Sequence, residues 1–313
     1  MAFERAFRTL LAGALALLLA SCGGGSTVVS DFQPTRVVVF GDAMADMKLP
    51  GGTALYTING DGSVNNWVRQ LASYYSLTPN AANVKAEAHA RITATSDAVG
   101  GSATSVTSQI SAWAGSFSSN DLVVVSAGTS DLIYEGNVAV VANTSAAQTT
   151  AATNVRQAAR ELATQIRQLV TNGAQRVMVL SPYNMGKTPW ASSTSSTSFL
   201  ETLSDEFYTE LVYYISDLSD KVLVVDARVQ MNSLVNSSSY VGSIVSCTPT
   251  AAGVGIGIGS GKVDSSLCNY ATAGDLVGTY DASKYLFADP VYPTPLAHRL
   301  LGDYAYGKLR SRW

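Results

Sequence analysis

The sequence has 313 residues, of which 47% are hydrophobic and 14% are charged, and its formal net charge at pH 7 is −3. This length and composition can bury a large core within one domain, and the lack of any basic cluster argues against a nucleic-acid partner. The only histidines are His89 and His298, so we expect no metal site, and we expect no cofactor.

The N-terminal segment has the features of an export signal. Arg5 and Arg8 precede an apolar run over residues 10–20, which is too short for a membrane-spanning helix. Leu-Ala-Ser-Cys at residues 19–22 is similar to a bacterial lipobox, in which Cys22 becomes the lipidated first residue of the mature protein. The alternative is an ordinary signal cleaved nearby, with no role for Cys22.

We therefore predict a lipoprotein signal peptide over residues 1–21, a flexible tether over 22–34 and one folded domain over 35–313. The sequence GGGST after Cys22 suits a flexible tether. Removing Arg5, Arg8 and Glu4 with the signal leaves 18 basic and 22 acidic residues, a net charge of about −4. The expected location is the bacterial cell envelope, with the lipid on Cys22 inserted in a bilayer. Because Gly23 and not Asp follows Cys22, we expect the outer membrane.

Apolar strands and amphipathic helices alternate through the rest of the chain. The predicted strands cover residues 37–40, 121–128, 176–180 and 221–227. The predicted helices lie within 64–75, 154–174, 199–215 and 294–309, and Gly173 is a natural stop for the second of them. Strands that are apolar throughout indicate a parallel sheet covered on both faces. We predict an α/β fold, a three-layer α/β/α sandwich with a central parallel sheet, similar to flavodoxin.

A Gly-rich insertion with a cysteine near each end lies at residues 246–268. It is superficially similar to a phosphate-binding loop, but Val263 follows Gly261-Lys262 and Ile256 stands where the first glycine is required. Cys247 and Cys268 are best interpreted as one disulfide formed in an oxidising compartment. We predict a surface loop closed by this disulfide.

Open parallel sheets bind ligands at the carboxyl ends of their strands. Here those ends are residues 41–43, 128–131 and 181–184. The first of them raises a question, because Gly41-Asp42 forms the kind of sharp turn that presents a nucleophile in many hydrolases, and the next residue is Ala43.

Four stretches together resemble the sequence blocks of the SGNH/GDSL family of ester hydrolases, which includes lipases, phospholipases and acylhydrolases. They are VVVFGDAMAD (37–46), AVGGSAT (98–104), VVVSAGTSDL (123–132) and FADPVYPTPLAHRLLGDYA (287–305). LSPYNMGKTPW (180–190) resembles a fifth run found in the secreted lipase branch, less closely. The resemblance covers essentially the whole mature chain and implies an ester-bearing ligand.

The resemblance assigns catalytic and oxyanion-hole positions that are largely replaced here. The family's serine nucleophile corresponds to Ala43, its oxyanion asparagine to Ser130 and its histidine base to Tyr292. Asp289, three residues before the base position, and the oxyanion glycine Gly101 (or Gly100) are retained. The methyl group of an alanine cannot act as a nucleophile, and a phenol with a pKa of about 10 is a poor base at neutral pH.

Neither histidine is a convincing replacement for the base. His298 fits the alanine-histidine pair of the family's last helix, which is usually structural, and His89 has no companion nucleophile in its motif. Ser130 is a still poorer nucleophile candidate, because it stands where an oxyanion donor is expected. Joint replacement of three residues that act as a unit points to a natural loss of the reaction.

Three functions remain open. The first is a non-catalytic lipoprotein that binds an acyl, acetyl-sugar or lipid-like ligand, or a protein partner, in the former cleft. The second is a weak ester hydrolase, and the third is a non-catalytic scaffold of the cell envelope whose cleft Tyr292 fills. Composition does not separate the first from the third.

Overall fold

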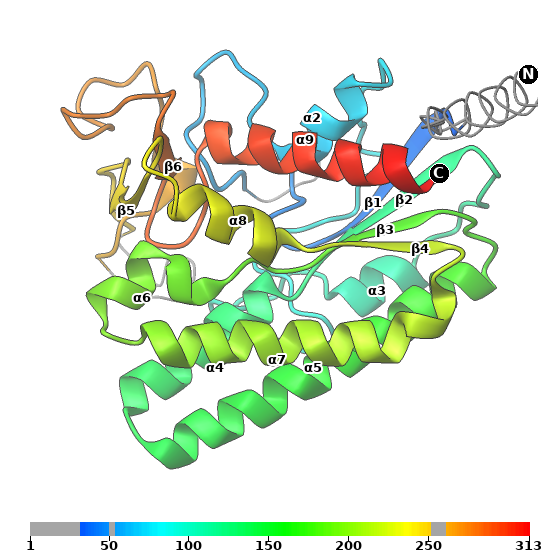
Figure 1. Cartoon of the computed structure of the whole chain (residues 1–313), viewed down its shortest axis with the longest axis horizontal. Coiled ribbons are helices and arrows are strands. Elements are labelled where there is room, and N and C mark those ends of the chain that lie inside the picture. The colour runs from blue at the N-terminus through cyan, green and yellow to red at the C-terminus, as the bar shows by residue number, and fades with distance from the viewer. Residues whose placement is uncertain (1–31, 50–53, 252–260) are drawn as a thin grey trace, which may run out of the picture.

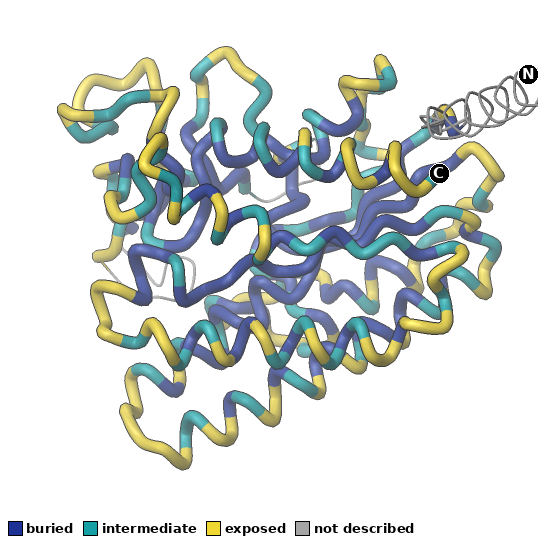
Figure 2. The backbone as a smooth tube through the Cα atoms, in the orientation of Figure 1, coloured by how far each residue is buried: buried dark blue, intermediate teal, exposed yellow. Residues whose placement is uncertain are grey.

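A parallel sheet of four strands forms the centre of the computed structural model, which describes residues 32–49, 54–251 and 261–313 (Figure 1). The strands β1 (Arg36–Gly41), β2 (Asp121–Ser126), β3 (Val177–Leu180) and β4 (Val222–Val225) lie side by side in chain order. The outer edge of β1 pairs with a single residue through the parallel bridge Val39↔Val84. All residues of β2 and β3 are buried, as expected for a sheet covered on both faces (Figure 2).

Helices cover both faces of this sheet (Figure 1). One layer contains α3 (Val106–Ser111), α4 (Thr129–Ala142), α5 (Ser145–Thr171) and α7 (Thr197–Ile215). The other contains α2 (Trp67–Ser73), α8 (Ala227–Val235) and α9 (Pro295–Arg312). The predicted three-layer α/β/α fold is therefore confirmed.

Most predicted elements occur within a few residues of their predicted bounds. α5 is the main exception, because it begins nine residues before 154, at Ser145, where the Thr144 side chain accepts from the Ala147 N–H. Gly173, with φ of +101°, ends it as predicted. The sequence did not predict α3, α4, α8, the short α6 (Pro189–Ser193) or the small parallel pair β5 (Val241–Val245) and β6 (Tyr285–Phe287). Three 3₁₀ helices complete the described elements: η1 (Met185–Lys187), η2 (Ser216–Leu218) and η3 (Ser265–Leu267).

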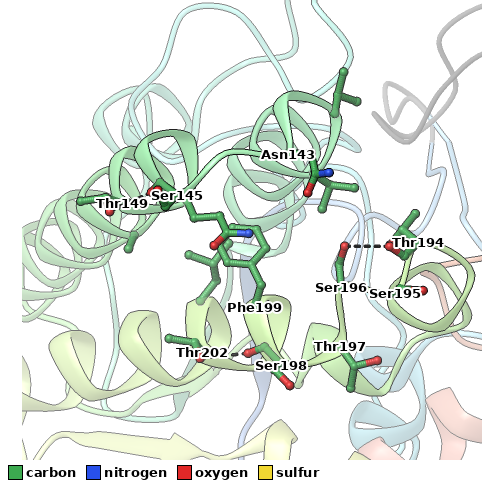
Figure 3. Close-up of a pocket in the computed structure, with 15 residues that line it drawn as sticks. Asn143, Ser145, Thr149, Thr194, Ser195, Ser196, Thr197, Ser198, Phe199 and Thr202 are labelled. Atoms are coloured by element: carbon green, nitrogen blue, oxygen red, sulfur yellow. Dashed lines mark hydrogen bonds between the residues drawn. The ribbon is translucent and has the colours of Figure 1, made fainter.

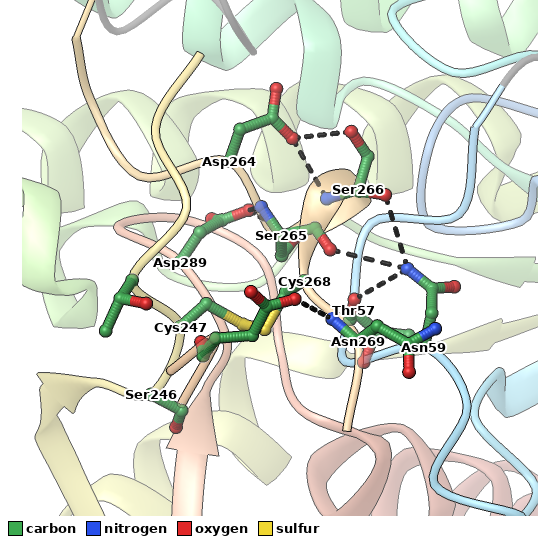
Figure 4. The surroundings of a disulfide bond; sticks show 12 residues. Thr57, Asn59, Ser246, Cys247, Asp264, Ser265, Ser266, Cys268, Asn269 and Asp289 are labelled. Atoms are coloured by element: carbon green, nitrogen blue, oxygen red, sulfur yellow. Dashed lines mark hydrogen bonds between the residues drawn. A yellow bond between two sulfur atoms is a disulfide. The ribbon is translucent and has the colours of Figure 1, made fainter. Parts of the chain in front are cut away.

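The disulfide predicted between Cys247 and Cys268 is present, with 5.9 Å between the Cα atoms (Figure 4). Its two ends are tied to different parts of the domain. The Cys247 N–H donates to the Ala288 carbonyl at 2.9 Å, next to Asp289. The Cys268 carbonyl accepts from the Asn59 N–H at 2.9 Å. The disulfide thus holds the segment around Asn59 beside the last sequence block.

Three predicted features lie partly or wholly outside the described residues. They are the signal peptide, Cys22 with most of the tether, and the middle of the Gly-rich insertion (252–260). In the part of the chain that the structure describes, no helix combines the length and hydropathy needed to cross a membrane.

Candidate active site

The turn after β1 requires a glycine at position 41. Gly41 has φ of +151°, and a Cβ atom there would lie 1.9 Å from the Ser126 carbonyl oxygen. The Gln109 side chain bonds to both backbone groups of Gly41. It accepts from the Gly41 N–H and donates to the Gly41 carbonyl, each at 2.9 Å. The turn places Ala43 at the carboxyl end of the sheet, as predicted, but its methyl group is only 2% exposed.

Asp42 links this turn to the start of α4. One carboxylate oxygen accepts from the Met44 N–H at 3.1 Å and the other from the Ser130 N–H at 3.2 Å. The side chain is fully buried. Burial raises the pKa of Asp42 to about 7, against the opposing effect of these hydrogen bonds.

Ser130 belongs to the first turn of α4, whereas the sequence placed it at the end of a strand. The preceding Gly128 has φ of +104°, and a Cβ on it would lie 2.3 Å from the Phe207 ring. Ser130 is fully buried, and its hydroxyl has no hydrogen-bond partner among the described residues. Its hydroxyl is therefore free, while its N–H is bonded to Asp42.

The two glycines of the second sequence block lie on an exposed turn around Asp97. The Gly101 N–H donates to the Asp97 carboxylate at 2.8 Å, and the Gly100 N–H donates to the Asp97 carbonyl at 3.2 Å. Both N–H groups already have acceptors in this structure. The assignment of Gly101 to an oxyanion hole stays a prediction from the family resemblance.

Asp289 is fully buried on the loop before α9 and accepts four hydrogen bonds, of which those from Ser265 can be followed in Figure 4. One oxygen accepts from the Val291 N–H at 2.8 Å and the Tyr292 N–H at 2.6 Å. The other accepts from the N–H and the hydroxyl of Ser265. Because a carboxylate offers about four lone-pair positions, no position is left for the ring of a base. Burial raises the pKa of Asp289 to about 6 despite these bonds.

Tyr292 is part of the apolar core. Its side chain is 1% exposed, and its ring packs 4.8 Å from the Tyr56 ring, centre to centre. The phenol has no hydrogen-bond partner among the described residues. Burial raises the pKa of Tyr292 well above its ordinary value, and nearby Asp42 adds to the shift. The phenol therefore stays protonated and cannot take a proton from a nucleophile at neutral pH.

The two histidines have different surroundings. His89, with φ of +66°, makes a 2.6 Å hydrogen bond between its Nε2 and the Tyr56 hydroxyl, and burial lowers the pKa of its imidazole. His298 is buried on α9, and neither ring nitrogen has a bonded partner in the described ranges. Burial lowers the pKa of His298 to about 3, although the backbone of Tyr56 lies near enough to oppose the shift. Neither imidazole bonds to Asp289.

Two residues that hold this site together were not predicted from the sequence. Gln109 fixes the Gly41 peptide, and a single glutamine on a short helix gives no signal in the sequence. Ser265 occupies one oxygen of Asp289. Its position three residues before Cys268 was the available hint, since a disulfide fixes the segment around each of its cysteines.

Asp42 bonds to the Ser130 N–H, and Asp289 bonds to the Tyr292 N–H. Among the described residues, the one hydroxyl that is hydrogen-bonded to an imidazole is that of Tyr56, which lies outside the family's nucleophile position. The hydroxyls of Ser130 and Tyr292 are buried and unpartnered. Groups of three or more residues suited to hold a metal ion are absent from residues 32–49, 54–251 and 261–313.

A sequence profile of the GDSL-like lipase/acylhydrolase family matches residues 37–305. The chain belongs to this family. It is also 28% identical over 156 residues to an uncharacterized protein in the trpE–trpG intergenic region of Pseudomonas putida. That match covers 50% of this chain and only 25% of the relative, so the chain spans about a quarter of that protein.

Several solved structures are similar to this GDSL-family chain. An extracellular lipase from Streptomyces rimosus is 13% identical with a TM-score of 0.46, and the alignment covers 89% of this chain and 100% of the lipase. A carbohydrate acetylesterase from Sinorhizobium meliloti is 12% identical with a TM-score of 0.44, over 89% and 99% of the two chains. An aryl esterase from M. smegmatis is 16% identical with a TM-score of 0.41, over 89% and 99%.

Proposed function

We propose that this protein is a non-catalytic GDSL-family protein of the bacterial cell envelope, in which the former catalytic site has become part of the folded core. One observation carries the proposal. The nucleophile position holds the buried methyl group of Ala43, and the base position holds the buried phenol of Tyr292.

The remaining groups offer little to ester hydrolysis. Loss of the nucleophile alone costs about 10⁶-fold in a serine protease. The rate enhancement that survives such a loss, about 10³–10⁴-fold over the reaction in water, depends on an intact oxyanion hole. Here the N–H groups of Gly101 and Ser130 donate to the carboxylates of Asp97 and Asp42. Both donors would have to be released before they could stabilise an oxyanion.

Lipidation of Cys22 would attach the domain at the end opposite this site. Phe32, the first described residue, packs 6.1 Å from the Trp313 ring and 4.2 Å below the Arg176 guanidinium. Both contacts lie beside the amino ends of the strands, where the chain enters β1 (Figure 1). The ten residues from 22 to 31 span at most about 35 Å when extended. The tether would therefore join the domain at the amino ends of the strands, whereas the former catalytic site lies at their carboxyl ends.

A second function is favoured by the two unpartnered hydroxyls of Ser130 and Tyr292. Buried polar groups in folded proteins are normally hydrogen-bonded. A small acyl or acetyl group with a carbonyl oxygen would supply the missing acceptor, as in an acetyl-sugar or another ester-bearing ligand. Because the Tyr292 ring occupies the core, only a small group would fit without moving it.

Labelling with a fluorophosphonate tests the non-catalytic proposal. We expect no covalent adduct on the unmodified protein. An active serine esterase, labelled under the same conditions, is the positive control. We also expect at most trace labelling of Ala43→Ser, because no base stands next to the new hydroxyl. Stoichiometric labelling of the unmodified protein would overturn the proposal.

A thermal-shift titration with ethyl acetate and N-acetylglucosamine tests the second function. Binding in the buried site predicts a rise in Tm that is lost in Ser130→Ala and in Tyr292→Phe. A rise of equal size in both variants, or no rise in the unmodified protein, would exclude a small acyl ligand at this place.

A further inference from the structure

A groove with a volume of about 1120 Å³ lies between the α4–α5 connection and the start of α7 (Figure 3). Its walls come from residues 140–152 on one side and 194–203 on the other. α4 separates it from the former catalytic site, because Ser130 is in the first turn of that helix and Asn143 follows its last turn. At 1.5 Å per residue these two positions are about 20 Å apart.

The lining of this groove is polar but carries no charge. None of its fifteen residues is Asp, Glu, Lys, Arg or His, and ten of them have a hydroxyl or a carboxamide side chain. The other five are apolar, and Phe199 and Leu203 among them also pack against the core. The groove therefore has an apolar base with neutral hydrogen-bonding groups around it.

Several of these polar groups are free to bind a ligand. The amides of Asn143 and Gln148 and the hydroxyls of Ser195 and Ser198 are in no hydrogen bond within the described part of the chain. In contrast, the Thr202 hydroxyl donates to the Ser198 carbonyl at 2.9 Å.

Two residues that line the groove have positive φ angles. Asn143 and Ser195 have φ of +49° and +54°, in the left-handed region that side-chain-bearing residues rarely adopt. They come from the two walls, and both are labelled in Figure 3. Asn143 is the C-cap of α4, and its N–H donates to the Ala139 carbonyl, so its left-handed conformation is that of an ordinary helix end. Ser195 likewise follows the end of α6.

We infer that this groove binds a neutral oligosaccharide. Sugar rings present many hydroxyl donors and acceptors together with apolar C–H faces, and the groove offers neutral polar side chains over an apolar base. A phosphate or carboxylate ligand is disfavoured, because no lysine, arginine or histidine lines the groove. The volume of about 1120 Å³ is slightly above the range of about 300–1000 Å³ common for small-molecule sites, which suits several sugar units. This inference is independent of the proposed function.

The N-termini of α5 and α7 also open on the groove, and their positive ends are the one feature of the lining that favours an anion. The side chain of the α7 N-cap residue, Ser196, makes no capping bond and donates instead to the Thr194 carbonyl at 3.2 Å. Backbone donors of α7 are thereby left for hydroxyl oxygens of a sugar. Inorganic phosphate is the competing ligand class and is included in the test.

The test is titration of the purified full-length mature protein with maltotetraose and with tetra-N-acetylchitotetraose, measured by saturation-transfer NMR and calorimetry. We expect saturable binding of at least one of them and none of inorganic phosphate. The double variant Asn143→Ala/Gln148→Ala should bind at least tenfold more weakly, since it removes two neutral hydrogen-bonding groups. Ser198→Trp should block binding by filling the groove.

Thr153→Ala/Thr164→Ala is the matched control. These exposed α5 threonines donate to carbonyls of their own helix, at 3.0 and 3.1 Å, and lie outside the groove. The Thr153 hydroxyl also accepts from the Arg156 guanidinium at 3.4 Å. The control should bind like the unmodified protein, and circular dichroism should show that all variants fold. Absence of binding to both sugars, equal loss in the control, or tighter binding of phosphate would each overturn the inference.

Discussion

At the scale of single residues, the hydrogen bonds of Asp289 support the proposed loss of catalysis. In a working triad one oxygen of this carboxylate must accept from the imidazole of the base. Here Ser265 supplies two donors to one oxygen, and the backbone of residues 291 and 292 supplies two to the other. The aspartate is retained, but its hydrogen bonds now fix loops.

This geometry predicts that restoring serine and histidine is insufficient. Ala43→Ser/Tyr292→His should show only weak ester hydrolysis, because Asp289 has no lone pair to orient the new imidazole. Adding Ser265→Ala removes the hydroxyl donor and frees one lone-pair position on Asp289, although the backbone N–H of residue 265 still donates to the same oxygen. This change should raise kcat/KM at least tenfold for p-nitrophenyl acetate. Ser266→Ala, one residue along, is the matched control and should not raise it. Equal activity of the double and triple variants would show that Ser265 does not limit the base.

His298 gives a prediction with a defined pH dependence. Its folded pKa is about 3 and its unfolded pKa about 6.5. The unfolded chain therefore binds one more proton between these values, and this residue lowers the free energy of unfolding as pH falls from about 6.5 to 3. Asp42 and Asp289, with raised pKa values of about 7 and 6, act in the opposite direction as pH rises through that range.

We expect His298→Leu to gain stability over the unmodified protein as pH is lowered, by at most about 1.4 kcal/mol per pH unit below pH 6. At pH 7.5 the free energies of unfolding of the two proteins should be similar, because two buried ring nitrogens without partners are replaced by an apolar group. Urea unfolding at pH 7.5 and 4.5 measures the difference. The same difference at both pH values would contradict the assigned pKa.

At the scale of elements, the turn after β1 depends on one glycine. Gly41→Ala should destabilise the domain by more than about 3 kcal/mol, because its Cβ would lie 1.9 Å from the Ser126 carbonyl oxygen on β2. Gly278→Ala is the control, since no atom lies within 4 Å of a Cβ there. Urea midpoints compare the two. A midpoint for Gly41→Ala equal to that of the control would mean that the turn tolerates a side chain.

How well the sequence predicted an element depended on how that element is buried. β1 to β4 are short apolar runs, and α7 and α9 have one apolar face, so periodicity located them. α4 was missed because it is buried on several faces, by Leu132, Ile133 and Ala139 among others, and shows no single stripe. β5 was missed because none of its five residues is fully buried.

The positions of the former site followed from the sequence, but their contacts did not. Ala43 and Asp289 lie where their blocks placed them. The packing of Tyr292 on Tyr56 joins residues 236 positions apart. The hydrogen bond from Ser265 to Asp289 joins the segment between the two cysteines to the loop before α9. Such contacts depend on tertiary packing, which local patterns do not encode.

At the scale of the whole molecule, the lipobox predicts an acylated Cys22 that tethers the domain to the outer membrane. Metabolic labelling with an alkyne fatty acid should mark the unmodified protein, and Cys22→Ser should lose the label. Ser21→Ala, beside it, is the control and should keep the label. Labelling of Cys22→Ser at the level of the unmodified protein would rule out this anchor.

The central claim is that a GDSL-family domain has lost ester hydrolysis while keeping its fold. The most direct measurement is steady-state hydrolysis of short-chain p-nitrophenyl esters by the unmodified protein, with His89→Ala and His298→Ala beside it. We expect rates equal to those of a heat-killed control for all three proteins. Robust turnover by the unmodified protein that is abolished in either histidine variant would contradict it and identify a relocated base.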